Sequence, residues 1–221
     1  MYNPTRITTP SRHADRVSYD AESVHQILDE ALICHVGFIA EERPQVLPML
    51  FVRIGSTVFV HSSTGAQMAK MAAHQAGIEV TVETTILDAL VLARSAFNHS
   101  ANYRSVVVHG TATLVRDPQA KTEILEALME KFVPGRNPEV RGPTEVELRQ
   151  TAVLALPLVH VSAKIRSGPP VDETEDISLP YWAGTWPLRL VHGTPEASPD
   201  LSPDIALPAH LHPGEGTRGA G

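Results

Sequence analysis

The segment richest in reactive side chains runs from residue 92 to residue 105, between two apolar runs typical of strands. Its polar members include Arg94, His99, Tyr103 and Arg104. Polar groups beside buried strands are costly unless they bond with one another or with a ligand. We therefore interpret this segment as part of a binding site.

Two interpretations of the charged groups in this segment stay open. Arg94 and Arg104 can hold an anion through paired hydrogen bonds, or they can form ion pairs with Asp88 and Glu83. His99 can donate a proton or stack on a ring, although a single histidine in a polar loop more often does neither.

A second candidate site lies at residues 61–65, where His61, Ser62 and Ser63 precede an expected short helix. Hydroxyl groups and the first N–H groups of a helix suit a phosphate, and Lys70 adds a positive charge. The alternative is that Ser63 or Thr64 only caps the helix.

A third candidate is the strand of residues 46–51, which contains Pro48. A proline cannot donate to the strand ladder, so this strand is either an edge strand or a place where a ligand approaches the neighbouring backbone.

A fourth candidate lies near the end of the last long strand, where Lys164 and Arg166 precede Trp182 and Trp186. These side chains either close over a planar ligand or tie the strand to the barrel wall.

Several chemistries are excluded by missing motifs. The histidines form no H-x-x-x-H pair and Cys34 is the only cysteine, so we expect no metal site. The chain has no G-x-S-x-G elbow or Walker loop, and the G-x-G-x-x-G spacing at residues 214–219 lies in the proline- and glycine-rich stretch and not between an expected strand and an expected helix, as the dinucleotide fingerprint requires. These absences argue against an α/β-hydrolase, a P-loop NTPase and a Rossmann dehydrogenase.

The composition indicates a packed cytoplasmic protein. The net charge of -7 over 221 residues argues against nucleic-acid and anionic-membrane surfaces, which require a basic face. No apolar run reaches the roughly 18 residues that a membrane span requires. A single cysteine excludes an internal disulfide.

The element pattern predicts an α+β fold that is mainly β, with flanking helices around an antiparallel barrel. Besides the short helix expected after residue 65, Asp20 is expected to cap one helix, Asp117 another, and Thr144 with Glu147 a further one through a capping box. Strands are expected at residues 33–40, 45–53, 57–61, 78–83, 86–93, 103–109, 111–115 and 151–165. We divide the chain into an N-terminal arm (1–19), a barrel domain (20–188) and a flexible tail rich in proline and glycine (189–221).

These motifs resemble the pyridoxamine 5′-phosphate oxidase-like FMN-binding split-barrel family, in the branch near the nitroimidazole-resistance proteins. The matching words are ILDEA (27–31), VLPM (46–49), LVLARSAF (90–97), NYRSV (102–106), PGR (134–136) and SAK (162–164). The resemblance covers about residues 5–188 and implies a homodimer with FMN at the subunit interface.

The resemblance also implies which residues bind the flavin. The positions that match its ring-binding and phosphate-binding residues are Val46, Leu47, Pro48, Met49, Leu50, His61, Ser62, Ser63, Gln67, Lys70, Ser105 and Trp182. Gln67 departs from the family, because relatives in this branch place a basic residue there. A phosphate prefers such a charged donor over a neutral amide.

The expected function is a flavin-dependent oxidoreductase that acts on a small molecule, with a reduced nicotinamide as one possible electron donor. His99, Tyr103 and Arg104 are assigned to the substrate side. Alternatives are a haem-binding protein with His61 or His99 as axial ligand, a non-catalytic flavin carrier, and a deazaflavin in the same groove.

Overall fold

Six antiparallel strands form a closed ring, which confirms the expected split barrel. The computed structural model describes residues 1–211. The ring runs in the order β6, β7, β4, β3, β2 and β5, and pairing between β5 and β6 closes it. Its strands are β2 (Ile33–Ala40), β3 (Arg43–Ile54), β4 (Thr57–Ser63), β5 (Ile78–Leu92), β6 (Ser100–Leu114) and β7 (Thr151–Pro157).

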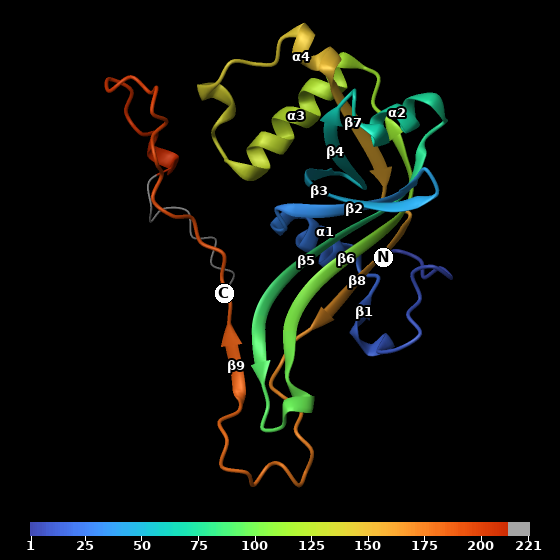
Figure 1. Ribbon diagram of the computed structural model, residues 1–221, viewed down its shortest axis with the longest axis vertical. Coiled ribbons are helices and arrows are strands. Elements are labelled where there is room, and N and C mark those ends of the chain that lie inside the picture. Colours follow the sequence, from blue (N-terminus) through green and yellow to red (C-terminus); the bar gives the residue numbers. More distant parts are fainter. Residues whose placement is uncertain (212–221) are drawn as a thin grey trace.

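Strands β5 and β6 are much longer than the ring requires. They pair from Ile78 with Ala112 to Val91 with Ser100 and extend as a curved arm below the barrel (Figure 1). Strand β8 (His160–Arg166) accompanies β6, β1 (Val17–Ser18) pairs with β8, and β9 (Gly184–Pro187) pairs with the far end of β5. Residues 93–99 of the polar segment therefore form the tip of this arm, and residues 100–105 run back from it along β6.

Four α-helices flank the strands, and three begin at the caps that the sequence predicts. They are α1 (Ala21–Glu30), α2 (Gln67–His74), α3 (Pro118–Phe132) and α4 (Glu145–Gln150). Asp20 and Asp117 accept hydrogen bonds from the first turns of α1 and α3, and Thr144 forms the capping box with Glu147. Short 3-10 turns lie at Ala14–Arg16, Ala96–Asn98, Asn137–Glu139 and Ala209–Leu211.

The main core fills the inside of the ring. Alternate residues of each strand point inward, and Val36, Phe51 and Val108 are almost completely buried there. A second cluster lies outside the ring, where Ile124 of α3 packs against Val52 and Val153. One face of β3, β4 and β7 is therefore covered by α3.

Five of the eight predicted strands were wrong about where one strand ends and the next begins. Residues 78–83 and 86–93 belong to one strand that ends at Leu92, because Thr84 and Thr85 continue the pairing with β6 without a break. Residues 103–109 and 111–115 likewise belong to one strand, which ends at Leu114. The expected strand over 151–165 is two strands, because the Leu158 N–H leaves the ladder and donates to the Ser56 carbonyl.

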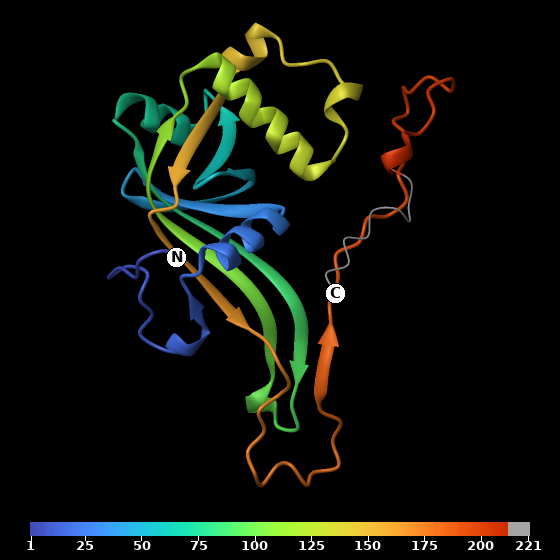
Figure 2. The ribbon, with the colours of Figure 1, turned by 180° about the vertical axis from the view of Figure 1, so that it is seen from behind.

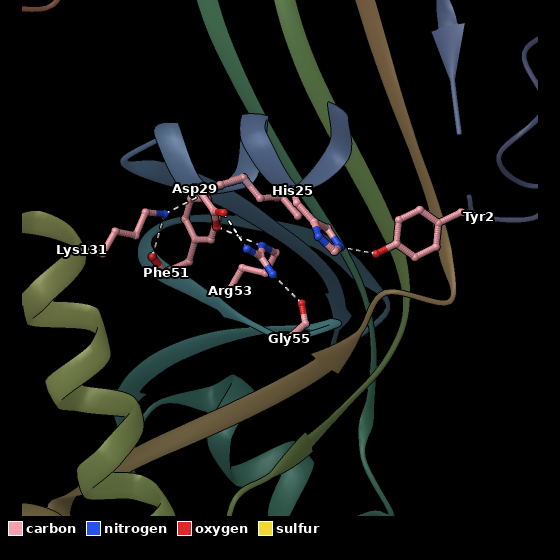
Figure 3. Close-up of polar contacts among 8 residues, drawn as sticks. Tyr2, His25, Asp29, Phe51, Arg53, Gly55 and Lys131 are labelled. Carbon is pink, nitrogen blue, oxygen red and sulfur yellow. Dashed lines mark hydrogen bonds and ion pairs between the residues drawn. The ribbon is translucent and has the colours of Figure 1, made fainter. Parts of the chain in front are cut away.

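A polar cluster joins the N-terminal arm, α1, β3 and α3 (Figure 3). Arg53 bridges Asp29 and the Gly55 carbonyl with contacts of 2.6 Å each. Lys131 donates to the carbonyls of Leu28 and Phe51 at 2.9 and 3.1 Å, and its ammonium lies 3.5 Å from the centre of the Phe51 ring. These contacts fix α3 against the end of α1.

The segment after β9 runs alongside the body at a distance from it (Figures 1 and 2). It starts where the Leu188 N–H donates to the Asp88 carbonyl, and at its other end His210 Nδ1 lies 3.6 Å from Glu139 Oε1. Between these anchors Leu190 and Val191 are exposed. Its expected flexibility stays a prediction, and residues 212–221 of the expected tail lie outside the described range.

In residues 1–211 we find no helix with the length and apolar character that crossing a bilayer requires.

Candidate functional site

The outer face of β2 and β3 is apolar and exposed. Ile33 pairs with Leu50, and Gly37 pairs with Val46, while the alternate residues of β2 point into the core. Ile33, Leu50 and Val46 are 50, 42 and 63% exposed. Apolar side chains grouped in this way on one surface mark a place where a ligand or another chain binds.

The strand predicted to line a flavin divides its residues between two faces. Val46, Pro48 and Leu50 share the outer face with the outward residues of β2. Leu47 and Met49 point the other way, and Met49 packs against the core. Three of the five predicted side chains therefore lie on the exposed face.

The β4–α2 corner brings the predicted phosphate-end residues together. Ser63 Oγ accepts a hydrogen bond from the Gly65 N–H at 3.1 Å, and the Ser62 hydroxyl donates to the Ser63 carbonyl. The α2 helix begins at Gln67 with no side-chain cap at Ala66. In the described chain, its first-turn N–H groups thus remain available to an anion.

The side chains around this corner set its charge. Gln67 donates to Glu41 Oε1 at 3.1 Å, which places an acidic residue of the β2–β3 turn beside the start of the helix. Lys70 is exposed one turn further along α2. His61 is half-buried, its Nδ1 has no hydrogen-bond partner within residues 1–211, and burial lowers its pKa. Lys70 is therefore the basic side chain that α2 offers to an anion here.

The polar segment at the arm tip is largely engaged in internal contacts. Arg94 donates from its backbone and its guanidinium to Asp172, at 2.8 Å in each case. Asn102 donates to the Gly168 carbonyl at 3.0 Å and accepts from Arg166. These bonds attach the loop after β8 to the ends of β5 and β6.

Arg104 bridges two carboxylates. It contacts Asp88 at 2.7 to 3.2 Å and Glu30 of α1 at 2.8 Å. Hydrogen bonds to Glu30 and Asp88 raise its pKa further above the ordinary value. The ion-pair interpretation is confirmed for Asp88, whereas Arg94 pairs with Asp172 and Glu30 is a partner that the sequence did not indicate. The substrate-side role of Arg104 stays a prediction.

The other predicted residues lie apart from the corner. His99 contacts the Ser95 carbonyl through Nδ1 at 2.9 Å at the arm tip, and Tyr103 is half-buried on β6. Ser105 is buried, and its hydroxyl donates to the Lys164 carbonyl at 3.3 Å. Trp182 is 69% exposed, and its ring lies over Gly184. Within one chain, the structure does not join them to the β4–α2 corner.

Sequence reasoning missed a strip of histidines on the outer face. His35 Nδ1 lies 3.6 Å from Glu83 Oε2, and His109 Nδ1 lies 3.0 Å from Thr81 Oγ1. His160 is the cross-strand partner of His109. Burial, and then repulsion by His160, lower the pKa of His109. The strand predicted over residues 33–40 contains His35, but the pairing of His35 with Glu83 depends on residues far away in sequence.

No group of three or more potential metal-ligating residues occurs within residues 1–211. A haem needs only one or two ligands from the protein, so single imidazoles remain relevant.

Comparisons with known proteins agree with this architecture. The family model described as pyridoxamine 5′-phosphate oxidase matches residues 20–165. The flavocytochrome Anf3 from Azotobacter vinelandii is 35% identical with a TM-score of 0.88, over 96% of this chain and 97% of that one. The FAD and haem binding protein from Mycobacterium smegmatis is 34% identical with a TM-score of 0.82, over 89% of this chain and 95% of that one.

A more distant structure shares the fold alone. A candidate 5-nitroimidazole antibiotic resistance protein from Bacteroides thetaiotaomicron is 20% identical with a TM-score of 0.57, over 67% of this chain and 86% of that one. No curated protein matches the chain.

Proposed function

Because the chain belongs to the pyridoxamine 5′-phosphate oxidase family, we propose that it is a flavin-binding oxidoreductase that also binds haem. The observation that carries the proposal is the uncapped start of α2 beside an exposed apolar sheet face. Such a pair of surfaces suits a ligand with an anionic tail and a flat ring. The haem is supported by the two similar proteins whose names include haem or cytochrome.

The residues of the corner would hold the phosphate end of the flavin. The first N–H groups of α2 and the hydroxyls of Ser62 and Ser63 supply donors, and Lys70 supplies a positive charge. Val46 and Pro48 on the outer face would contact the ring. The resemblance implies FMN, whereas the Mycobacterium smegmatis protein is named for FAD, so the proposal concerns the flavin ring common to both.

A bound flavin supplies the transfer of a hydride or of electrons between a donor and an acceptor. The chain would bind the ring and exclude water from it. We assign His99 and Tyr103 to the substrate side and a reduced nicotinamide to the role of donor. We assign a small molecule as the substrate, as the family resemblance implies.

We also propose that the active form is a homodimer. Exposed apolar side chains on β2 and β3 and in the segment after β9 would become buried against a second copy. Multi-angle light scattering on the full chain tests this. A dimer is expected, and removal of the residues after Pro187 should weaken it at low micromolar concentration. A parent that is monomeric throughout would contradict the assignment.

Identification of the cofactors tests the proposed function directly. We expect the purified chain, reconstituted with FMN or FAD and with haem, to show flavin bands together with a Soret band. Mass spectrometry of the released cofactor identifies the flavin, and the pyridine haemochrome assay measures the haem. A chain that takes up neither group would refute the proposal.

The phosphate end can be tested separately with two variants of one helix. Lys70→Ala combined with Ser63→Ala should weaken flavin binding about tenfold or more, because one charge-assisted contact contributes about 1.5–3 kcal/mol. His74→Ala, an exposed change at the other end of α2, is the control and should bind flavin like the parent. Equal flavin affinity in all three proteins would remove the corner from the site.

A further inference from the structure

A surface hollow of about 250 Å³ lies between α2, the end of β6 and the start of α3. Its lining includes Ala69 and Ala73 of α2 and the cations Arg116 and Lys121, and within residues 1–211 no acidic side chain contributes to it. The chain as a whole holds 25 acidic residues against 18 lysines and arginines. Two cations without an acidic neighbour in the lining therefore depart from the charge of the chain and favour an anion.

The backbone holds Arg116 beside the hollow from both sides. The preceding Val115 N–H donates to the Val153 carbonyl at 2.9 Å, and the following Asp117 accepts a hydrogen bond from the first turn of α3 at 2.8 Å. The Arg116 guanidinium has no hydrogen-bond or ion-pair partner among the residues that the structure describes. Its planar fork of N–H groups matches the oxygens of a phosphate, so these donors are available to such a group.

Lys121 adds a second cation in the first turn of α3. Its ammonium donates to the Leu148 carbonyl of α4, which holds the side chain in place. An ammonium has three donors, so two remain for a ligand. A lysine in a first turn lies at the positive end of the helix dipole, and an anion nearby would offset that repulsion.

A second hollow, of about 310 Å³, has the opposite charge balance. Its lining holds the cations Arg53 and Lys131 together with the acidic residues Asp29 and Glu130. Arg53 pairs with Asp29 at 2.6 Å, and Lys131 donates to two backbone carbonyls. Its charges are satisfied within the chain, so this second hollow does not favour an anion.

The first hollow adjoins the β4–α2 corner. Thr64 lines the hollow and directly follows Ser63, and consecutive Cα atoms are about 3.8 Å apart. On α2, Ala73 lies three residues after Lys70 and is therefore its neighbour on the helix surface. The hollow is smaller than the roughly 300–1,000 Å³ of a whole small-molecule site, so it suits one group of a larger ligand.

We propose that this hollow binds a phosphate group of a nucleotide through the Arg116 guanidinium and the Lys121 ammonium. The inference rests on the proposed function, since the corner next to it would hold the phosphate end of the flavin. The shared boundary at Thr64 favours the second phosphate of FAD as the source, and a phosphate of the nicotinamide donor is the other source. FMN has a single phosphate, which the corner would hold, so the chain should prefer FAD.

Fluorescence titration of the full-length protein with FAD and with FMN tests the site. The parent should bind FAD about tenfold or more tightly than FMN, because hydrogen bonds to charged groups change affinity by about that factor. Arg116→Gln should lose most of this preference and keep the parent's affinity for FMN, while Arg116→Lys should retain part of it. Arg12→Gln, the same change at an exposed arginine of the N-terminal arm, is the matched control and should bind both flavins like the parent.

Calorimetry with NADP⁺ on the FMN-loaded protein distinguishes the second source, because NADP⁺ carries the phosphates of the donor but cannot reduce the flavin. Unchanged flavin affinities in Arg116→Gln, with an affinity for NADP⁺ about tenfold lower, would assign the phosphate to the nicotinamide. Equal affinities of the parent and Arg116→Gln for FAD, FMN and NADP⁺ would overturn the proposal. An equal loss of FAD and FMN binding would also overturn it, since Arg116 would then support the corner or the fold.

A pair of changes at Ala73 keeps the test valid if Arg116→Gln folds poorly. Ala73 is exposed on α2, so Ala73→Glu adds a negative charge at the hollow, and Ala73→Gln adds a neutral side chain of the same size. The preference for FAD should fall more in Ala73→Glu than in Ala73→Gln. Equal preferences in the two variants would count against a phosphate in the hollow.

This inference and the proposed function fail in different ways. A parent that takes up no flavin contradicts the proposed function, and the hollow is then tested with ADP alone. The parent should bind ADP about tenfold or more tightly than Arg116→Gln does. Equal binding of ADP by the two proteins, or binding by neither, would overturn the assignment of the hollow.

Discussion

Replacement of Arg104 by methionine separates a structural role from a catalytic one. The guanidinium joins Glu30 of α1 to Asp88 of β5, and its side chain is 25% exposed, against 45 and 34% for the two carboxylates. A hydrogen bond to a charged group contributes about 1.5–3 kcal/mol when it is shielded, and an exposed ion pair about 0–1 kcal/mol. Because these groups are partly exposed, we expect Arg104→Met to lower the free energy of unfolding by about 2 kcal/mol.

The assay is thermal unfolding, combined with flavin content and turnover on the same samples. For a chain of this size, 2 kcal/mol corresponds to a decrease in Tm of about 4–8 °C. The triple variant Arg104→Met, Glu30→Gln, Asp88→Asn should recover part of the loss, because no unpaired carboxylates then face each other. An unchanged Tm with lost turnover would refute the structural reasoning and support the substrate-side assignment.

Three further changes probe other parts of the molecule. Burial lowers the pKa of Lys131 to about 8, below its ordinary value of 10.5. Between pH 8 and 10.5 the unfolded chain therefore binds more protons than the folded chain, and the free energy of unfolding should rise with pH. Denaturation of the parent and of Lys131→Met at pH 8 and 10 should show that rise only in the parent. Gly184→Ala should displace the Trp182 ring, because the new Cβ would lie 2.8 Å from it, and tryptophan fluorescence reports the change while the Tm stays nearly constant. Gln67→Lys should tighten flavin binding, measured by fluorescence titration, only when Glu41→Gln accompanies it, since Glu41 otherwise pairs with the new lysine.

Local signals in the sequence predicted the local structure well. The Asp20 cap and the strand over residues 33–40 require only neighbouring residues, and the structure confirms both. The break between β7 and β8 depends on Ser56, about a hundred residues earlier, so no pattern near Leu158 indicated it. The partner of Arg104 on α1 was missed for the same reason.

In the candidate site, too, the sequence predicted the contacts between neighbouring residues and missed those between distant ones. The resemblance brought the residues of the β4–α2 corner together, and they are close in sequence. The contact of His35 with Glu83 had no distinguishing motif, because it depends on the register that places Glu83 opposite His35. Periodicity assigns a residue to a face of a strand but does not say whether that face is covered.

The outer face of β2 and β3 begins beside the phosphate corner. Gln67 contacts Glu41 in the turn just after Ala40, so the corner adjoins the end of β2. Val46 pairs with Gly37, which lies three residues before Ala40, and at about 3.4 Å per residue this corresponds to about 10 Å along the strand. The ring of a flavin whose phosphate lies at the corner can therefore reach Val46. For this reason, a change at Lys70 is expected to remove the whole cofactor and not only its phosphate contacts.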